Sequence, residues 1–524
     1  MSQFLFQYYP VHPTTWVYLS SLLMVGLFFK FGRFWSVRNL DLVLLILLAP
    51  GLLLVHFGSE TVKREGVTAS DASAKPKPRS DTTATDLGSR PQEPAKSAEK
   101  APAAGESIPA AKPSGLDAAA TVAASADDVA SQIPRTRLSG RALQYIGFVW
   151  LLSACGLFLL RLLLDPTMVR RPLLEPNLSP GGLTFIGCSL FVFLMANVVN
   201  SQITEENLAS ARGADQLLSG VPDQGAAALL KKHGPGNALL HFVPSLATVP
   251  LTWNEGGVAD VNVRYVRIAK IMAILSHFAI VFGIVAIGYR HFDNIRMGLG
   301  AATLYLMLPY TSQMTGRVDH VLPAALLVWA VLCYRRPLTS GMFIGMAIGV
   351  IYYPLFLLPL WISFYWQRGL LRFLGGVAVT LTASVLSLVL VSTSPADFLA
   401  KVQVLFGIWL PLREGLQGIW QLGWDPIFRI PLMAGFVAIS CAMAIWPAQK
   451  NLGTLLSCSA AIMVATQFWH GFGGGLYMAW FLPLVLLTIF RPNLEDRIAL
   501  SVLAESWFQK RRHRTGLNGA EKAA

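Results

Sequence analysis

Residues 183–220 read LTFIGCSLFVFLMANVVNSQITEENLASARGADQLLSG, an apolar run followed at once by a polar segment. The apolar part, residues 183–199, contains no charged residue. A helix of about 20 predominantly apolar residues crosses a bilayer core of roughly 30 Å. The run therefore predicts a membrane-spanning helix, and two adjacent carboxylates, Glu205 and Glu206, follow directly after its exit.

The composition extends this prediction to the rest of the chain. Of its 524 residues, 54% are hydrophobic and 14% are charged. The mean hydropathy of +0.51 lies well above that of a soluble globular domain. Because lipid offers no hydrogen-bond partners, each long apolar segment must pair its backbone groups internally, as a helix does. We expect an all-α, polytopic transmembrane bundle.

Apolar runs of suitable length recur as far as residue 490. The stretch 338–366 is too long for one crossing and is interrupted by Tyr352, Tyr353 and Pro354, so we expect a hairpin of two short helices there. With this hairpin, the pattern predicts about thirteen crossings. The other expected spans lie near residues 16–31, 40–57, 143–164, 181–200, 267–289, 297–314, 319–334, 373–392, 431–447, 452–469 and 475–490.

The basic residues form short clusters between apolar runs, as in RR at 170–171 and KRRHR at 510–514. This pattern is typical of cytoplasmic loops, so the net charge of +13 indicates membrane topology and not nucleic-acid binding. The alternation predicts a multi-pass protein of the cell inner (plasma) membrane, with its N-terminus outside and its C-terminus in the cytoplasm. The five cysteines lie in apolar runs without CxxC spacing, so neither a disulfide framework nor a zinc site is indicated.

Four segments are expected along the chain. Residues 1–57 form a two-span hairpin, and residues 143–490 form the main transmembrane bundle. Between them, residues 58–142 contain no Phe, Trp or Tyr and are rich in Ala, Pro, Ser and Lys, which predicts a disordered linker. Residues 491–524 form a basic cytoplasmic tail.

The segment 393–430 carries apolar residues at helical spacing, which fits a helix lying in the membrane interface. An ordinary buried amphipathic helix is the alternative. The interfacial interpretation is favoured because three tryptophans, whose rings prefer that depth, belong to the segment. The residues concerned are Phe398, Val402, Leu405, Phe406, Trp409, Trp420 and Trp424.

Glu205 and Glu206 have a purely structural interpretation, because Thr204 is a good N-cap and acids in a first helical turn are stabilised by the macrodipole. Capping does not explain why the acids come immediately after a membrane exit. A carboxylate beside a low-dielectric slab has its pKa raised by desolvation and can accept a proton from a sugar hydroxyl. The functional hypothesis is that one of the pair is a general base.

Three further positions on the predicted outward side carry polar groups. Arg317, Asp319 and His320 directly precede an apolar helix, and either form a substrate-binding corner or simply pair and cap locally. Tyr352 and Tyr353 are either interface aromatics or groups that contact a head group or a sugar. His470 precedes a glycine-rich loop and is either structural or part of the site. The glycines of that loop are expected to permit close approach by a neighbour or a ligand.

The order of several segments resembles the GT-C class of integral-membrane glycosyltransferases, and within it the polyprenol-phosphate-mannose-dependent glycosyltransferase family 87. The resemblance covers residues 181–490 and rests on the motif order and not on any single motif. The segments are NLASARGADQLLSG at 207–220, HFVPSLATVPL at 241–251, the stretch from GLGAATLYLMLPY at 298 to FLLPL at 360, and YMAWFLPLVLL at 477–487.

The resemblance implies transfer of a mannose-like sugar from a polyprenyl-phosphate donor to a glycan, lipid or protein acceptor on the extracytoplasmic face. In that family an acid at the start of the first large outward loop is the expected base, and it corresponds here to Glu205 or Glu206. Arg317 would neutralise the donor phosphate, and Asp319, His320, Tyr353 and His470 would line the pocket, with Tyr352 beside them. A divalent metal would be compatible with this chemistry but is not required by it.

Departures from the family pattern leave two other classes of function open. The acid is Glu where Asp is more frequent, and Tyr352, Tyr353 and Pro354 stand where the family has a Lys-containing turn. One alternative is a transporter or flippase of a lipid-linked or anionic substrate, although the chain lacks the internal repeat of broken helices typical of such proteins. The other is a catalytically inactive membrane scaffold.

Overall fold

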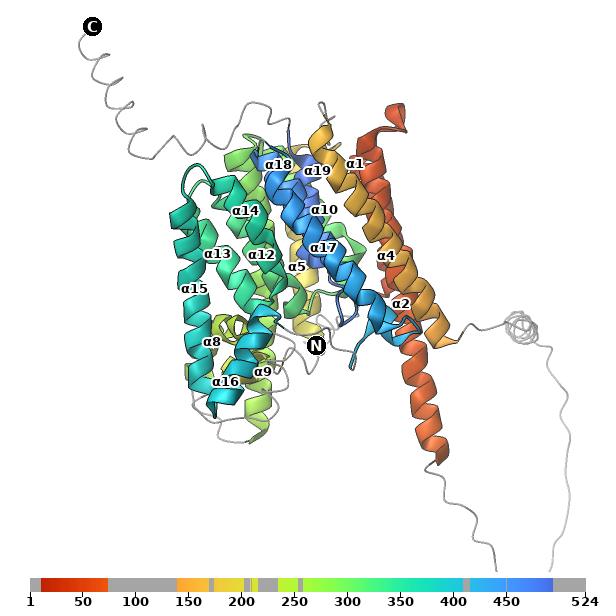
Figure 1. The fold of residues 1–524 in the computed structure, drawn as a ribbon. Coiled ribbons are helices and arrows are strands. Elements are labelled where there is room, and N and C mark those ends of the chain that lie inside the picture. Colours follow the sequence, from red (N-terminus) through yellow and green to blue (C-terminus); the bar gives the residue numbers. More distant parts are fainter. Residues whose placement is uncertain are drawn as a thin grey trace, which may run out of the picture. The chain divides into compact units, whose positions relative to one another are not determined.

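A computed structural model describes residues 11–73, 139–168, 174–201, 208, 210–214, 234–252, 258–408, 415–448 and 450–492. Within these residues the secondary structure is helical, with a single isolated bridge between Gln417 and Phe472 and no strand (Figure 1). The predicted helical fold is therefore confirmed. The α-helices are α1 Pro13–Phe28, α2 Val37–Ser73, α4 Gly140–Leu164, α5 Pro180–Asn200, α8 Pro235–Thr252, α9 Val258–His291, α10 Ile295–Met307, α11 Pro309–Gln313, α12 Val318–Leu332, α13 Pro337–Val350, α14 Leu358–Tyr365, α15 Leu370–Val391, α16 Pro395–Phe406, α17 Arg429–Ile445, α18 Leu452–Ala465 and α19 Leu482–Phe490.

Short 3-10 helices connect several of these elements, namely η2 Phe31–Arg33, η3 Asp165–Thr167, η4 Tyr353–Leu357, η5 Gly418–Gln421, η6 Pro426–Phe428, η7 Thr466–Phe468 and η8 Met478–Trp480. Six segments of the described helices are long and apolar enough to cross a membrane, and the chain is a helical membrane protein. Shorter apolar helices of 10–17 residues accompany them. The expected total of about thirteen crossings remains a prediction.

The chain divides into two compact units, residues 1–57 with 143–524 and residues 58–142. Helix α2 continues beyond residue 57 as far as Ser73, so the first part of the expected linker is helical instead of disordered. The physical reason is that a helix already nucleated by an apolar span extends at little cost through residues such as Glu60 and Arg64, which form an i,i+4 ion pair at 3.7 Å. Linker residues 74–138 lie outside the described part of the chain.

The stretch 338–366 contains the expected interruption. Helix α13 ends at Val350, and η4 begins at Tyr353, which leaves Tyr352 between the two elements. Proline disfavours a helical conformation in the residue before it and lacks an N–H, so Pro354 prevents one continuous helix. The break places both tyrosines at one end of α13, where they belong to the candidate site described below.

Helices α13 and α15 run side by side and approach closely through glycines (Figure 1). A Cβ at Gly341 would overlap the carbonyl of Phe373, and a Cβ at Gly376 would overlap the carbonyl of Leu338. Small residues three or four positions apart let the backbones of membrane helices pack directly, which replaces the missing hydrophobic driving force with van der Waals contact. Gly341 of α13 and Gly376 of α15 thus serve helix packing.

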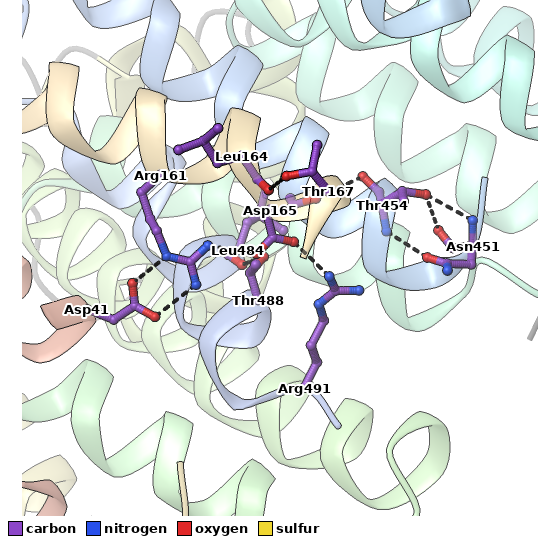
Figure 2. Close-up of polar contacts among 11 residues, drawn as sticks. Asp41, Arg161, Leu164, Asp165, Thr167, Asn451, Thr454, Leu484, Thr488 and Arg491 are labelled. Atoms are coloured by element: carbon purple, nitrogen blue, oxygen red, sulfur yellow. Dashed lines mark hydrogen bonds and ion pairs between the residues drawn. The ribbon is translucent and has the colours of Figure 1, made fainter. Parts of the chain in front are cut away.

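A buried chain of alternating charges joins the N-terminal hairpin to the main bundle (Figure 2). Arg161 on α4 donates from Nε to Asp41 Oδ1 on α2 at 2.7 Å and from Nη1 to Asp165 Oδ1 at 2.9 Å. Arg491, which follows α19, donates from Nη2 to Asp165 Oδ2 at 2.7 Å. A Cβ at Gly453 would overlap the Arg491 guanidinium, so only glycine leaves room for this arginine. The hairpin is therefore part of the folded bundle and not a separate appendage.

Helix α16 covers part of the segment expected at the interface. Ser394 caps it by accepting from the Asp397 backbone N–H, and Lys401 Nζ lies 2.7 Å from Asp397 Oδ2, which together with Thr393 lowers the pKa of that carboxyl. Leu405 is buried, whereas Leu399 is 57% exposed, so the helix is amphipathic. Trp409 lies outside the described residues. Trp420 is 5% exposed, so its ring packs inside the protein. The interfacial position of the segment remains a prediction.

Candidate functional site

The predicted corner before α12 forms an ion pair at the start of that helix. Arg317 precedes α12, and its Nε and Nη2 donate to the two Asp319 carboxylate oxygens at 3.1 and 3.0 Å. The Asp319 side chain is 3% exposed and that of Arg317 is 26% exposed. The local pairing that the sequence left as an alternative is thus present. It holds the guanidinium in a fixed orientation at the border between the interior and the surface.

His320 is held by a hydrogen bond at Nδ1 and has an acidic neighbour near Nε2. Its Nδ1 lies 2.6 Å from the Tyr310 hydroxyl of α11, and its Nε2 lies 3.6 Å from Asp319 Oδ2. The imidazole also stacks on Tyr477, with ring centroids 4.3 Å apart. The Trp480 indole donates to the Asp319 carbonyl at 3.3 Å, which ties the residues after η7 to the start of α12.

The loop that carries His470 and Tyr477 is organised by a buried amide. Gln467 Oε1 accepts from the backbone N–H groups of Gly475 and Tyr477 at 3.1 and 3.2 Å, and its Nε2 donates to the Tyr477 carbonyl. Gly473 and Gly475 have φ values of +88° and +93°, which side chains other than glycine rarely adopt. Gly473 and Gly475 therefore serve the backbone conformation of the loop. Gly474 permits close approach, because a Cβ there would overlap the Gln467 carbonyl.

Five aromatic and histidine rings from three chain segments lie in contact. Tyr352 stacks on Tyr353 at 4.2 Å, and Tyr353 lies 5.0 Å from His470. His470 lies 4.4 Å from Tyr477, which in turn stacks on His320. Tyr353, His320 and His470 are 2–4% exposed. Burial raises the pKa of Tyr352 to about 12, so its hydroxyl stays protonated at neutral pH and can act as a donor.

One charged residue of this cluster was not singled out from the sequence. Arg429, at the start of α17, is 5% exposed, and its Nε donates to the Trp469 carbonyl at 3.1 Å. Its guanidinium lies 3.0 Å from the position that a Cβ at Gly471 would occupy. An arginine beside a membrane span is costly to bury and is usually functional. This rule was the sequence signal that could have identified Arg429.

Glu205 and Glu206, the predicted general bases, lie outside the described residues. The chain is described up to Ser201, just after α5, and resumes at Leu208. A Cβ at Gly316 would lie 3.6 Å from Ser201 Oγ, so the end of α5 adjoins the Arg317 corner. Ser201 is the last described residue before the two glutamates, and it lies beside this corner.

The structure brings together all six predicted substrate-binding residues, through direct contacts or through Tyr477. They are Arg317, Asp319, His320, Tyr352, Tyr353 and His470. Sequence analysis did not identify Tyr310, Tyr477 or Arg429, which complete the cluster. Among the described residues, no group of three or more His, Cys, Asp or Glu side chains has the arrangement of a metal site.

The fold and this cluster define a helical membrane protein with a buried, polar and aromatic site at the start of α12. Searches against protein-family models, curated proteins and solved structures found no match to the chain. The function is therefore argued from the site itself.

Proposed function

We propose that this chain is a membrane glycosyltransferase that moves a mannose-like sugar from a polyprenyl-phosphate donor to a glycan, lipid or protein acceptor. The observation that carries the proposal is the meeting of the α12 corner, the turn before η4 and the loop after η7 in one cluster. These segments are far apart in the sequence, yet each was predicted separately to bear site residues. Such convergence of a few polar groups within aromatic surroundings is typical of a small-molecule site.

The chemistry assigns a role to each charged group. An acceptor hydroxyl attacks C1 of the sugar while Glu205 or Glu206 takes the hydroxyl proton. The bond between C1 and the phosphate oxygen breaks, and polyprenyl phosphate leaves with the electron pair, so the configuration at C1 inverts. Arg317 and Arg429 stabilise the negative charge on the leaving phosphate. Because Asp319 offsets part of the Arg317 charge, the buried Arg429 supplies the second cation that the step requires.

The aromatic part of the cluster suits the sugar. Tyr353, His470 and Tyr477 pack against one another at tilted angles. Aromatic rings are the side chains that pack against the apolar C–H groups of a sugar ring, so this part of the cluster is where we place the sugar. The Tyr352 hydroxyl, protonated at neutral pH, donates to sugar or phosphate oxygens. Donor and acceptor would meet on the extracytoplasmic side of the inner membrane, where lipid-linked sugars are accessible. No nucleic acid takes part.

The test replaces the two predicted bases. Membranes containing the full chain, with acceptors still present, are incubated with polyprenyl-phosphate mannose carrying a radiolabel, and the label transferred is measured. Glu205→Gln/Glu206→Gln should lower the transfer rate about 100-fold or more, because general-base catalysis is worth about that factor. Glu175→Gln, an exposed acid in the segment before α5, is the matched control and should retain full transfer.

Two other outcomes would reject the proposal in favour of the alternatives. If wild-type membranes move the labelled lipid across the bilayer without transferring its sugar, the chain is a flippase. If neither movement nor transfer depends on the wild-type chain, and the Gln variants behave like it, the bundle is a scaffold. In both cases the cluster around His320 would have a role other than sugar transfer.

A further inference from the structure

Trp469 combines deep burial with a hydrogen-bond donor that the protein does not use. The residue directly follows η7 and is 3% exposed. Its indole Nε1 is buried, and no described residue accepts a hydrogen bond from it. Most buried polar groups in proteins are paired, so each exception calls for an explanation.

Three other buried indoles of this chain are paired, whereas Trp16 Nε1 on α1 is, like that of Trp469, without a described partner. Trp361 Nε1 donates to Ser459 Oγ at 3.1 Å, Trp420 Nε1 donates to the His470 carbonyl at 3.0 Å, and Trp480 Nε1 donates to the Asp319 carbonyl. The fold thus pairs indole groups in the same cluster where a partner is needed. What distinguishes Trp469 from Trp16 is its place beside Tyr353 in the candidate site.

The surroundings hold the Trp469 ring firmly in place. Its centroid lies 5.1 Å from that of Tyr353 and 5.4 Å from that of Phe436, and it also contacts Tyr352 at 6.1 Å. Its carbonyl accepts from Arg429 Nε at 3.1 Å. Both the ring and the backbone are therefore fixed, and reorienting the ring to find an acceptor would disrupt these contacts.

We propose that Trp469 is a further substrate-contact residue, whose Nε1–H donates to a hydroxyl or ring oxygen of the donor's sugar. This inference rests on the glycosyltransferase function proposed above. The neutral indole N–H is suited to donate to an uncharged sugar oxygen. The negatively charged phosphate is better bound by the guanidinium groups of the nearby arginines. The cost of an unpaired donor in the free protein is recovered when sugar binds, which favours a hydroxylated ligand over an apolar one.

The experiment measures binding and stability of Trp469→Phe, which keeps an aromatic ring and removes the N–H. The purified full-length protein in detergent is titrated with polyprenyl-phosphate mannose, and in parallel with polyprenyl phosphate lacking the sugar, while the ligand-induced rise in Tm is recorded. Without ligand, we expect the Tm of the variant to stay close to that of the wild type, because removal of the unpaired N–H offsets part of the cost of the smaller ring. It should bind the mannosyl lipid about 3- to 10-fold more weakly and the sugar-free lipid equally well.

Two tryptophan variants serve as matched controls. Trp361→Phe removes a paired indole N–H, so it should lower the Tm and leave the affinity for the mannosyl lipid unchanged. Trp16→Phe removes the other buried tryptophan N–H without a described partner, on α1 where the ring stacks on Phe193, and should change neither quantity.

The outcomes separate this inference from the function on which it rests. If the wild type binds the mannosyl lipid more tightly than the sugar-free lipid but Trp469→Phe binds both like the wild type, the role of Trp469 is refuted and the function stands. A fall in Tm larger than that of Trp16→Phe, with unchanged affinity, would show that the N–H interacts with neighbouring rings such as Phe356 instead. If the wild type binds neither lipid, both proposals fail.

Discussion

At the scale of single residues, the cluster depends on a buried glutamine side chain, Gln467, that holds the backbone of a loop in place. Gln467 is fully buried, and its side-chain amide oxygen accepts hydrogen bonds from the backbone N–H groups of Gly475 and Tyr477, in the loop that carries His470. A side-chain amide has one acceptor oxygen and two donor hydrogens, and here both ends are engaged. The loop therefore keeps its conformation without regular secondary structure.

Gln467→Met tests this role, because methionine has nearly the same length but lacks the amide that hydrogen-bonds to the loop backbone. The variant leaves the N–H groups of Gly475 and Tyr477 buried and unpaired, so we expect the free energy of unfolding to fall by about 2–4 kcal/mol. Thermal unfolding in detergent measures the change. Gln403→Met, at an exposed position of α16, should change stability by less than about 0.5 kcal/mol. Equal effects of the two substitutions would contradict the role of Gln467.

At the scale of elements, adjacent glycines of α15 face different surroundings. A Cβ at Gly376 would overlap the Leu338 carbonyl of α13, whereas a Cβ at Gly375 would meet no atom within 4 Å. Periodicity alone does not distinguish these two neighbours, because both lie in the same apolar run. The difference arises from the side on which α13 packs.

Gly375→Ala and Gly376→Ala are predicted to have effects of opposite sign. Gly376→Ala forces α13 and α15 apart, and we expect a loss of about 1–3 kcal/mol in the free energy of unfolding. Gly375→Ala adds helix propensity without a clash, and we expect a gain of about 0.5–1 kcal/mol. The comparison requires only the midpoints of thermal unfolding in one detergent. Similar destabilisation by both variants would refute the close approach of the two helices at Gly376.

At the scale of the whole molecule, the charge chain from Asp41 through Arg161 and Asp165 to Arg491 connects segments from both ends of the sequence (Figure 2). The Asp165 side chain is fully buried. Opposite charges are placed so that each arginine has a carboxylate at 2.7–2.9 Å. Removing one member leaves another buried charge uncompensated, which is where the energetic cost lies.

Arg161→Ala removes the arginine that pairs with Asp41. Asp165 then keeps Arg491 as its partner within the chain of charges. We expect a loss of about 3–5 kcal/mol in the free energy of unfolding, measured by thermal or denaturant unfolding in detergent. Arg64→Ala is the matched control, since Arg64 also pairs with an acid four residues away but has a side chain 83% exposed. Its effect should stay within about 0.5 kcal/mol. A small effect of Arg161→Ala would show that the charges are solvated in the folded protein.

The sequence by itself determined the helical class and the break before Pro354, and it singled out six polar or aromatic residues that the fold brings together. These inferences follow from local physics. The length of an apolar run determines whether a helix can span the membrane, proline interrupts such a helix, and a polar group beside an apolar run is costly and therefore indicates a function. Tertiary structure alone decided that Arg429, Tyr310 and Tyr477 complete the cluster and that Trp420 is buried. It also decided that Asp41 pairs with Arg161, far away in sequence. Such contacts depend on which faces of different helices meet, and a single sequence carries no local signal for that choice.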